Sequence, residues 1–485
     1  MPFALVFGAA TALVALVLFN SGMLANAKTR LQNAADAGAY SAGVLQARDH
    51  NFSALTNRAM VANQAAVAQL VSLKSYLEDA VDTRDRMSGP VLGTQATIHP
   101  TSKPAWDAAK SSGIKTIAKN FNKAAPWAVQ GLDKLIAAYA TAQQSHHAAT
   151  AIEMVVLADE VVKRNDPNAA ITKGVFTAGR TSFEVKSWDE YTEHFRANDP
   201  STAADRFADV VVNKDTTDNF TRFRPSVPNG KWEKKSVKWC VVLPNHIKSS
   251  TSFVFGHAGG TLLSKDKRSW EALDATMGGG FASCTFWAVC GIYPCPKTLV
   301  IPILDVGGSG GGLAGKSGYD SLTGYTNNPT LSKTYGGAFF IPAGAWRYKF
   351  TGPGASLDKA GGLQDYYRDV KDFATKPANQ SAELNGNMGV TFEVERKAAT
   401  IHTSTKLLPN SKQLAAPDGM KGDTMRALSS ASAYFYRSTA NKGFTRSGWS
   451  RSDGKTEMAN LFSPYWQSRL VDRSLADRAA SWAAQ

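Results

Sequence analysis

Cysteine and long apolar runs are both scarce in this chain of 485 residues. There are only four cysteines, all between positions 240 and 295, and only one apolar run is long enough to cross a membrane. A polytopic membrane protein is therefore excluded. The chain is also too long for one core of ordinary size, so we expect at least two structural units. With 43% apolar and 19% charged residues, an intrinsically disordered chain is excluded as well.

Acidic residues are fewer than basic ones, 40 against 54, which gives a net charge of +14. A basic excess of that size favours contact with polyanions such as anionic lipid, lipopolysaccharide or nucleic acid. It carries no information about the fold.

The first 27 residues contain no charge, and residues 3–24 form a run of roughly 22 mostly apolar positions. A helix of that length crosses a bilayer core of about 30 Å. No basic residue precedes the run and no small-x-small cleavage site follows it, so we expect a retained span rather than a cleaved signal peptide. On hydropathy alone, a plain membrane anchor is the simplest interpretation.

Proline is absent from residues 26–87, and glycine occurs there only at Gly38 and Gly43. The first stop signal is Ser-Gly-Pro at 88–90, which predicts one continuous helix of about 85 residues and about 130 Å. Such a helix cannot be buried in one globular domain and must lie against partner helices. Small residues recur every fourth position and form a face that permits close helix packing: Ala35, Ala39, Gly43 and Ala47. This design is typical of a filament subunit.

Three segments carry a family resemblance: NSGMLANAKTRLQNAADAGAYSA at 20–42, NFSALTNRAMVANQ at 51–64, and ANLFSPYWQSRL at 459–470. They resemble the N-terminal signature, its continuation and the closing motif of the TadE/TadG-like proteins of tight-adherence (Flp, type IVb) pilus systems. The resemblance covers about the first 75 residues and the last 60. It implies a bacterial envelope or surface protein with its bulk outside the inner membrane. Type IV pilins usually have Glu at the fifth mature position, where this chain has Leu5.

The predicted class is α+β, with a long pilin-like hydrophobic helix and helical stem followed by an irregular β-rich globular head. We expect a transmembrane or filament-core helix at 1–27, an amphipathic small-residue stem at 28–88, a helical hairpin packed on the stem at 89–169, and the head at 170–485. The hairpin helices are expected at 103–122 and from Pro126 to about 165. The strongest strand patterns lie at 236–243, 298–304, 337–341 and 389–394, and 424–436 reads as a late helix.

The cysteines are even in number and locally placed, which favours an oxidising compartment. Cys240, Cys284, Cys290 and Cys295 supply either two disulfides or four thiolates to zinc. Only Cys290 and Cys295 have the spacing of a zinc knuckle, so two disulfides are expected, with three pairings open.

Other motifs favour structure over chemistry. GGGLAGKS at 310–317 matches the phosphate-loop pattern, but the residues after it lack the helix that would hold phosphates. Residues 305–309 resemble the metal-ion motif of von Willebrand type A domains, with Gly307 where a hydroxyl is needed. A flexible glycine loop is the expectation there. His146 and His147 point about 100° apart on a helix, which excludes a shared metal. Residues 231–239 interleave lysines with tryptophans and predict an amphipathic strand.

The leading hypothesis is a structural subunit of an extracellular type IV or Tad-like pilus, with no enzymatic activity, cofactor or metal. Its partners are copies of itself in a helical filament, other pilins, and the bacterial inner membrane before assembly. One alternative is a membrane-anchored Tad pilus-assembly protein or minor pilin with a periplasmic head. Another is a surface adhesin that binds polyanionic surfaces through Lys234 and Lys235. The filament core is predicted to use the large apolar side chains Phe3, Leu5, Phe7, Leu13, Leu16 and Phe19.

Overall fold

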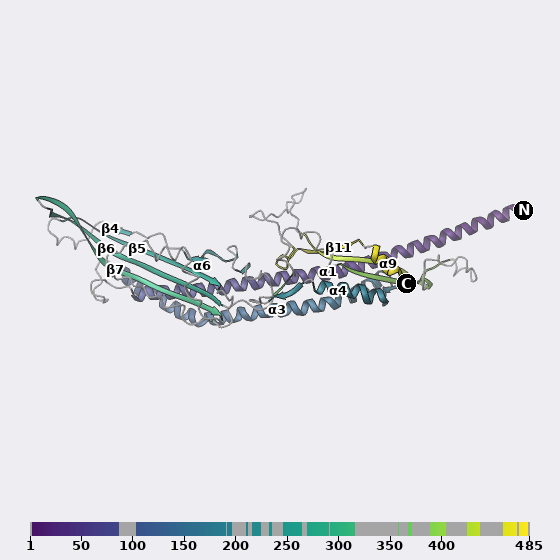
Figure 1. The fold of residues 1–485 in the computed structure, drawn as a ribbon, viewed down its shortest axis with the longest axis horizontal. Helices are drawn as coiled ribbons and strands as arrows, with labels where there is room; N and C mark the ends of the chain where they lie inside the picture. Colours follow the sequence, from purple (N-terminus) through teal and green to yellow (C-terminus); the bar gives the residue numbers. More distant parts are fainter. Residues whose placement is uncertain are drawn as a thin grey trace. The chain divides into compact units, whose positions relative to one another are not determined.

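The computed structural model describes residues 2–86, 103–190, 192–195, 210–211, 216–224, 232–234, 246–263, 269–290, 292–315, 357, 367–370, 389–403, 424–436, 459–472 and 475–483. Its first element is α1, Pro2–Arg86, an unbroken helix of 85 residues (Figure 1). The predicted continuous helix is thereby confirmed, and with it the α+β class, because strands dominate the described part of the chain after α3 (Ile114–Asn165).

By their internal contacts, the residues divide into two compact units that each draw on distant parts of the sequence. Unit 1 consists of residues 1–58, 139–195 and 367–485, and unit 2 consists of residues 59–138 and 196–366. Helices α1 and α3 therefore contribute one part to each unit. The domain boundaries given in the sequence analysis stay a prediction.

Unit 1 is built on a four-stranded antiparallel sheet with the order β1-β9-β10-β11. The strands are β1 (Ala169–Ile171), β9 (Val390–Lys397), β10 (Thr424–Phe435) and β11 (Trp466–Val471). Two further strands pair with each other, β2 (Thr192–Phe195) and β8 (Tyr367–Val370). Unit 1 also contains the short α-helices α4 (Ser182–Asp189) and α9 (Leu475–Ala483). The core joins α1 and α3 to the sheet, and its large members include Leu31, Met154, Trp188, Phe392 and Trp466.

The helix expected at 424–436 is wrong, because this segment is strand β10. Its alanines and serines have good or neutral helix propensity, but the strand is paired on both sides, with β9 and with β11. Its small side chains Ala427, Ala431 and Ala433 are buried in the core. Pairing and burial therefore override local propensity, as they commonly do in central strands.

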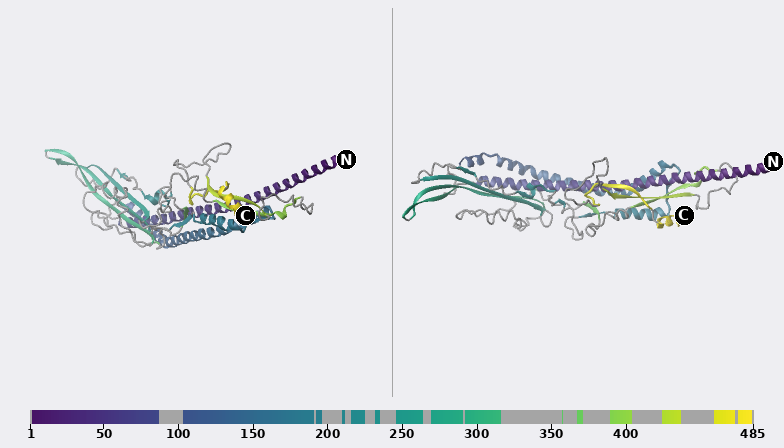
Figure 2. Two further views of the ribbon diagram at one scale, coloured as in Figure 1. Left: turned by 45° about the vertical axis from the view of Figure 1, so that its right-hand side comes forward. Right: turned by 90° about the horizontal axis from the view of Figure 1, so that it is seen from above.

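Unit 2 contains a sheet with the order β3-β5-β6-β7, in which β4 also pairs with β5 (Figure 2). The strands are β3 (Phe223–Arg224), β4 (Trp232–Lys234), β5 (His246–Leu263), β6 (Ser269–Cys290) and β7 (Tyr293–Gly315). Two short helices belong to the same unit, α2 (Lys103–Ser111) and α6 (Asn219–Arg222). The helix break expected before Pro126 is instead at Ser112 and Gly113, and Pro126 lies inside α3.

The glycine-rich run at 307–312 is part of β7, so the expected flexible loop is wrong. Glycines at every second position face α1, where added Cβ atoms would overlap helix atoms. Gly312 meets the Val71 carbonyl, and Gly310 meets the Ser75 carbonyl. Two strand residues advance about 6.6 Å and four helix residues about 6 Å, so the two periods run in step. Glycine is needed here for close approach of two backbones.

Side chains of α1 also bond to the backbone of β7, the last strand in the described order. Ser75 donates to the Gly310 carbonyl at 3.1 Å and Lys74 to the Gly311 carbonyl at 3.0 Å. The Asp82 carboxylate accepts from the Ser309 N–H at 2.9 Å. These bonds satisfy backbone groups that an edge strand otherwise leaves open to pairing with another chain.

We predict that Gly310→Ala lowers the stability of unit 2 by at least about 2 kcal/mol, because the added methyl displaces β7 from α1. The matched control is Gly131→Ala in α3, where an added Cβ meets no atom within 4 Å. That change should raise stability slightly through helix propensity. Thermal unfolding of the detergent-solubilised chain measures both. Equal melting temperatures for the two variants would contradict the close-approach account.

Candidate functional site: the N-terminal helix and the polar clusters that hold it

The first part of α1 presents its large apolar side chains to the outside. Phe3 is 90% exposed and Leu5 74%, and Phe7, Leu13 and Phe19 are exposed too, whereas Leu16 is partly buried. Within the described residues, α1 is the helix that is long and apolar enough to cross a membrane, and none of its most apolar window is buried. Exposed apolar surface of this extent needs lipid or a protein partner to cover it.

Burial in unit 1 becomes extensive from Ala27 onward. The small residues singled out in the sequence, Ala35, Ala39, Gly43 and Ala47, are all buried. A Cβ at Gly43 would lie 3.2 Å from the Ala431 Cβ of β10 and would also press on the Ser468 side chain of β11. A Cβ added at Gly38, five residues before Gly43, would lie 2.8 Å from the Val162 side chain of α3.

The small-residue face of α1 thus receives strands and a helix of the same chain. Contact between copies through this face stays a prediction. Enlarging Ala39 or Gly43 would disturb unit 1 itself, so such variants do not separate filament packing from folding.

A buried carboxylate, Asp49, joins α1 to α3. Nδ1 of His146 lies 2.7 Å from one carboxylate oxygen, and Nδ1 of His147 lies 2.6 Å from the other. His147 also approaches Asp189, the last residue of α4, at 2.9 Å through Nε2. The two adjacent histidines therefore share one carboxylate on a neighbouring helix. In the described part of the chain, no group of three or more His, Cys, Asp or Glu side chains has an arrangement that could hold a metal ion.

Aromatic rings enclose this carboxylate cluster. The rings of His147 and Trp188 stack with centroids 4.3 Å apart, and the Trp188 indole N–H donates to Nε2 of His50 at 3.0 Å. His50 in turn meets Trp466 edge-on at 4.5 Å. Helix α1 is thereby tied to α4 and to the first residue of β11.

The charge of Asp49 is stabilised by its partners. Burial by itself raises the pKa of this carboxyl, but the hydrogen bonds with His146 and His147, and the charges of His147 and His50, outweigh it. The result is a pKa held well below the usual range. With its oxygens occupied by two imidazoles, the group serves to hold helices together.

A second set of polar side chains on α1 binds the closing segment of the chain. Asn51 accepts from the Trp466 N–H at 3.0 Å and donates to its carbonyl at 2.9 Å. Asn57 donates to the Leu461 carbonyl at 2.7 Å, and Arg58 to the Phe462 carbonyl at 2.6 Å. Ser468 of the closing segment also donates to the Tyr40 carbonyl at 3.1 Å. The structure thus brings together all three segments that carry the family resemblance, although the last is about 400 residues from the other two in the sequence.

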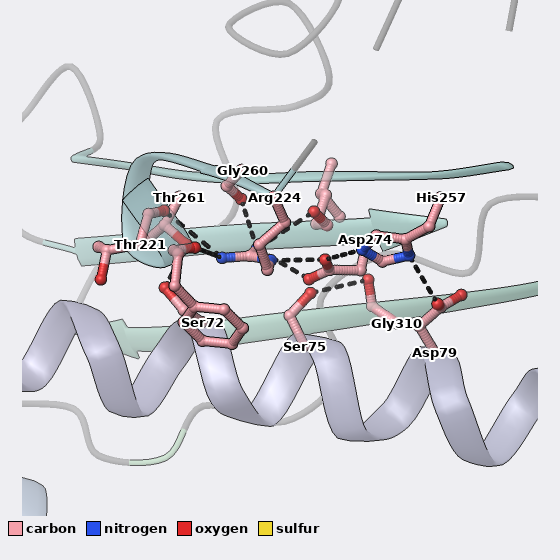
Figure 3. Close-up of polar contacts among 12 residues, drawn as sticks. Ser72, Ser75, Asp79, Thr221, Arg224, His257, Gly260, Thr261, Asp274 and Gly310 are labelled. Atoms are coloured by element: carbon pink, nitrogen blue, oxygen red, sulfur yellow. Dashed lines mark hydrogen bonds and ion pairs between the residues drawn. The ribbon is translucent and has the colours of Figure 1, made fainter. Parts of the chain in front are cut away.

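Unit 2 holds a separate buried ion network between α1 and the sheet (Figure 3). Arg224 of β3 forms a two-pronged pair with Asp274 of β6, at 2.5 and 2.8 Å. His257 of β5 lies between two carboxylates, 3.2 Å from Asp274 and 3.3 Å from Asp79 of α1. The Thr276 hydroxyl donates to Asp79 at 2.6 Å.

The charges in this network balance one another. Burial lowers the pKa of His257, but its contacts with Asp274 and Asp79 outweigh that effect and raise it to about 9. Burial raises the pKa of Asp79, against the contacts with His257 and Thr276. Arg224 also donates to the Gly260 carbonyl at 3.0 Å and to Thr261 at 3.1 Å. Each charged side chain pairs with a side chain from another element of the same unit, and such pairing is typical of a network that stabilises the fold.

The remaining candidate residues are placed only in part. Cys290 and Cys295 form a disulfide, and no described cysteine is free, whereas Cys240 lies outside the described residues. Lys316, Ser317 and Lys235 also lie outside the described residues, as do the strands expected at 236–243 and 337–341. Asp49, Asp79 and Arg224 were not predicted from the sequence, because no motif near any of them indicates its distant interaction partners.

We predict that Asp49→Asn lowers the stability of unit 1 by about 3 kcal/mol, because it breaks a buried charged cluster. A depressed pKa stabilises the fold above the unfolded value of about 3.9, and that stability is lost as the pH falls. The difference between wild type and variant should therefore narrow from pH 5 to pH 2. Denaturant unfolding followed by tryptophan fluorescence measures it. Glu160→Gln, on the exposed side of α3, is the control and should change stability little.

We predict that His257→Gln costs unit 2 about 3 kcal/mol of stability at pH 6. The raised pKa of about 9 means that this contribution is complete below the unfolded value and is lost as the pH rises through about 9. The cost should therefore fall toward zero at pH 10. His402→Gln, at an exposed position, is the control. A cost that is the same at pH 6 and pH 10 would contradict the charged state assigned to His257.

Comparison with known proteins gives one positive finding. Residues 1–49 match the family model described as "Putative Flp pilus-assembly TadE/G-like". No curated protein and no solved structure matches the chain. Pilus-assembly families of this kind are typically structural rather than enzymatic, and the match together with the exposed apolar helix supports membrane association. The resemblance predicted from the sequence is thereby confirmed for this segment: residues 1–49 are similar to the TadE/G-like proteins of Flp pilus assembly.

Proposed function

We propose that the chain is a structural subunit of a Tad-like pilus filament, held in the bacterial inner membrane before assembly and extracellular afterwards. The observation that carries the proposal is the N-terminal part of α1. Its apolar side chains are exposed at the end of a helix whose later residues are built into folded units. The family match covers the same segment.

The contact surface available to other copies is narrow. The face at 35–47 is filled by the chain's own α3, β10 and β11, so subunit contact through α1 must rely on about the first 22 residues. Burial of one Leu or Phe side chain contributes about 1.5–3 kcal/mol, so a handful of these side chains outweighs ordinary surface contacts. Association through this segment would also remove the apolar surface from water when the subunit leaves the lipid.

One observation favours the alternative of a membrane-anchored assembly protein or minor pilin. An exposed run of about 22 residues spans about 33 Å as a helix, close to one bilayer crossing of about 30 Å. An anchor needs nothing more than that. The two functions differ in what surrounds the helix: fluid lipid tails in an anchor, and rigid neighbouring helices in a filament.

Two substitutions that enlarge the helix distinguish these functions. Gly8 and Ala10 are exposed and two residues apart, which is a rotation of about 200° around the helix axis, so they lie on nearly opposite sides of the helix. A Cβ at Gly8 meets no atom of the chain within 4 Å, so enlargement there does not disturb folding. In a filament, at least one of Gly8→Leu and Ala10→Leu should reduce the yield of sheared filaments about tenfold or more by blocking close helix packing. Both variants should still reach the membrane.

The control is Leu18→Ile, which keeps the volume of an exposed apolar side chain and should leave filament yield unchanged. Mass spectrometry of sheared filaments supplies the second readout. Normal yield from both enlarged variants, or only trace amounts of this chain in the filaments, would reject the major-subunit function and favour the anchored protein.

A further inference from the structure

The far end of the β6–β7 hairpin in unit 2 has large apolar side chains that are exposed among the described residues. Val289 is 85% exposed, Ile292 94% and Tyr293 77%, and Trp287 is about half exposed. These four residues lie within the seven positions 287–293, on the two sides of one turn. Isolated apolar residues are common on protein surfaces, but a contiguous group of this kind marks an interaction site.

The hairpin end is a narrow and stiff element. β6 pairs with β7 as far as Cys290 and Tyr293, whereas the described pairing of β5 with β6 stops at Phe286. Among the described strands, the last four pairs are therefore a two-stranded ribbon, and the disulfide between Cys290 and Cys295 closes its turn. A turn that is already closed loses little conformational freedom when it docks.

The charges around the hairpin end have one sign. Residues 275–304 contain no Asp or Glu, and Lys297 is their only charged residue. Lys248 of β5 pairs in register with Thr285 and is also exposed. The element therefore combines an apolar end with cations set back from it, which complements an anionic surface.

The exposed apolar and aromatic side chains lie at the outer end of the ribbon, and its cation lies behind them. Ile292 lies at the turn, and Tyr293 comes directly after it in the pair with Cys290. Val289 is one pair further back and Trp287 three pairs further back. Lys297 lies four residues behind Tyr293. At about 3.3 Å per residue, the lysine is about 13 Å behind the tyrosine. Aliphatic and aromatic side chains favour the hydrocarbon and interface of a bilayer, and a cation set behind them favours the anionic headgroups. A protein partner would instead need a deep apolar pocket to receive a projecting turn.

We propose that the β6–β7 hairpin end is a membrane-docking element that inserts Val289 and Ile292 into the surface of a bilayer containing anionic phospholipid. The site is separate from the N-terminal helix and does not rest on the filament function. It gives the protein a second lipid contact, made by unit 2.

The test uses the full chain with its N-terminal helix held in amphipol, so that this helix cannot enter added vesicles. Flotation with phosphatidylcholine vesicles, with and without phosphatidylglycerol, measures binding. The wild type should bind best to the anionic vesicles. Val289→Ser combined with Ile292→Ser should weaken binding about tenfold or more, because two apolar side chains no longer leave water. Lys297→Glu should weaken binding to anionic vesicles only.

Trp127→Ser is the matched control, because Trp127 is 76% exposed on α3 in the same unit but away from the hairpin. It should leave vesicle binding unchanged. Brominated lipid should quench the wild type more than Trp287→Phe, which places the hairpin in the bilayer. Wild-type binding by the double serine variant would overturn the proposal. A loss of self-association in that variant without a loss of vesicle binding would also overturn it, and would assign the hairpin to contact with a second copy.

Discussion

Close packing of other elements directly on the backbone of α1 is the constraint on which both units depend. In unit 1 the helix offers Gly38 and Gly43 to α3 and the sheet, and in unit 2 the glycines of β7 lie against helix carbonyls. Side chains on either partner would push these layers apart. The glycines and alanines therefore allow one helix to be buried in the cores of two units. Buried hydrogen bonds between α1 and its neighbours then fix the positions of those neighbours.

The parts of the fold that depend on neighbouring residues could be predicted from the sequence. The lack of proline from 26 to 87 and the signal at 88–90 gave the extent of α1 to within a few residues. The uncharged run identified the exposed apolar segment, and the motif at 20–42 indicated the resemblance to TadE/G-like proteins. Each of these features depends on one continuous segment of the sequence, so periodicity, stop signals and hydropathy are enough to identify the feature.

The features that were missed depend on partners far away in the sequence. The sequence around His146 and His147 does not indicate that both will contact Asp49. The alanine-rich segment at 424–436 likewise does not indicate that strands will pair with it on both sides. The glycines of β7 did carry a signal. Gly308, Gly310 and Gly312 alternate as a strand face does, but Gly307 and Gly311 hide the alternation and make the run look like a loop.

The buried polar cluster around Asp49 also fixes the position of α1 along its own axis. A shift by one helical turn, about 5.4 Å, would bring Leu45 or Ser53 opposite the two histidines and leave buried imidazoles without a carboxylate. The same shift would break the bonds from Asn57 and Arg58 to the closing segment. A purely apolar helix face has no such register, because one alanine packs much like the next. A load applied to the exposed N-terminal helix, in a membrane or in a filament, is therefore transmitted to unit 1 without slippage of α1.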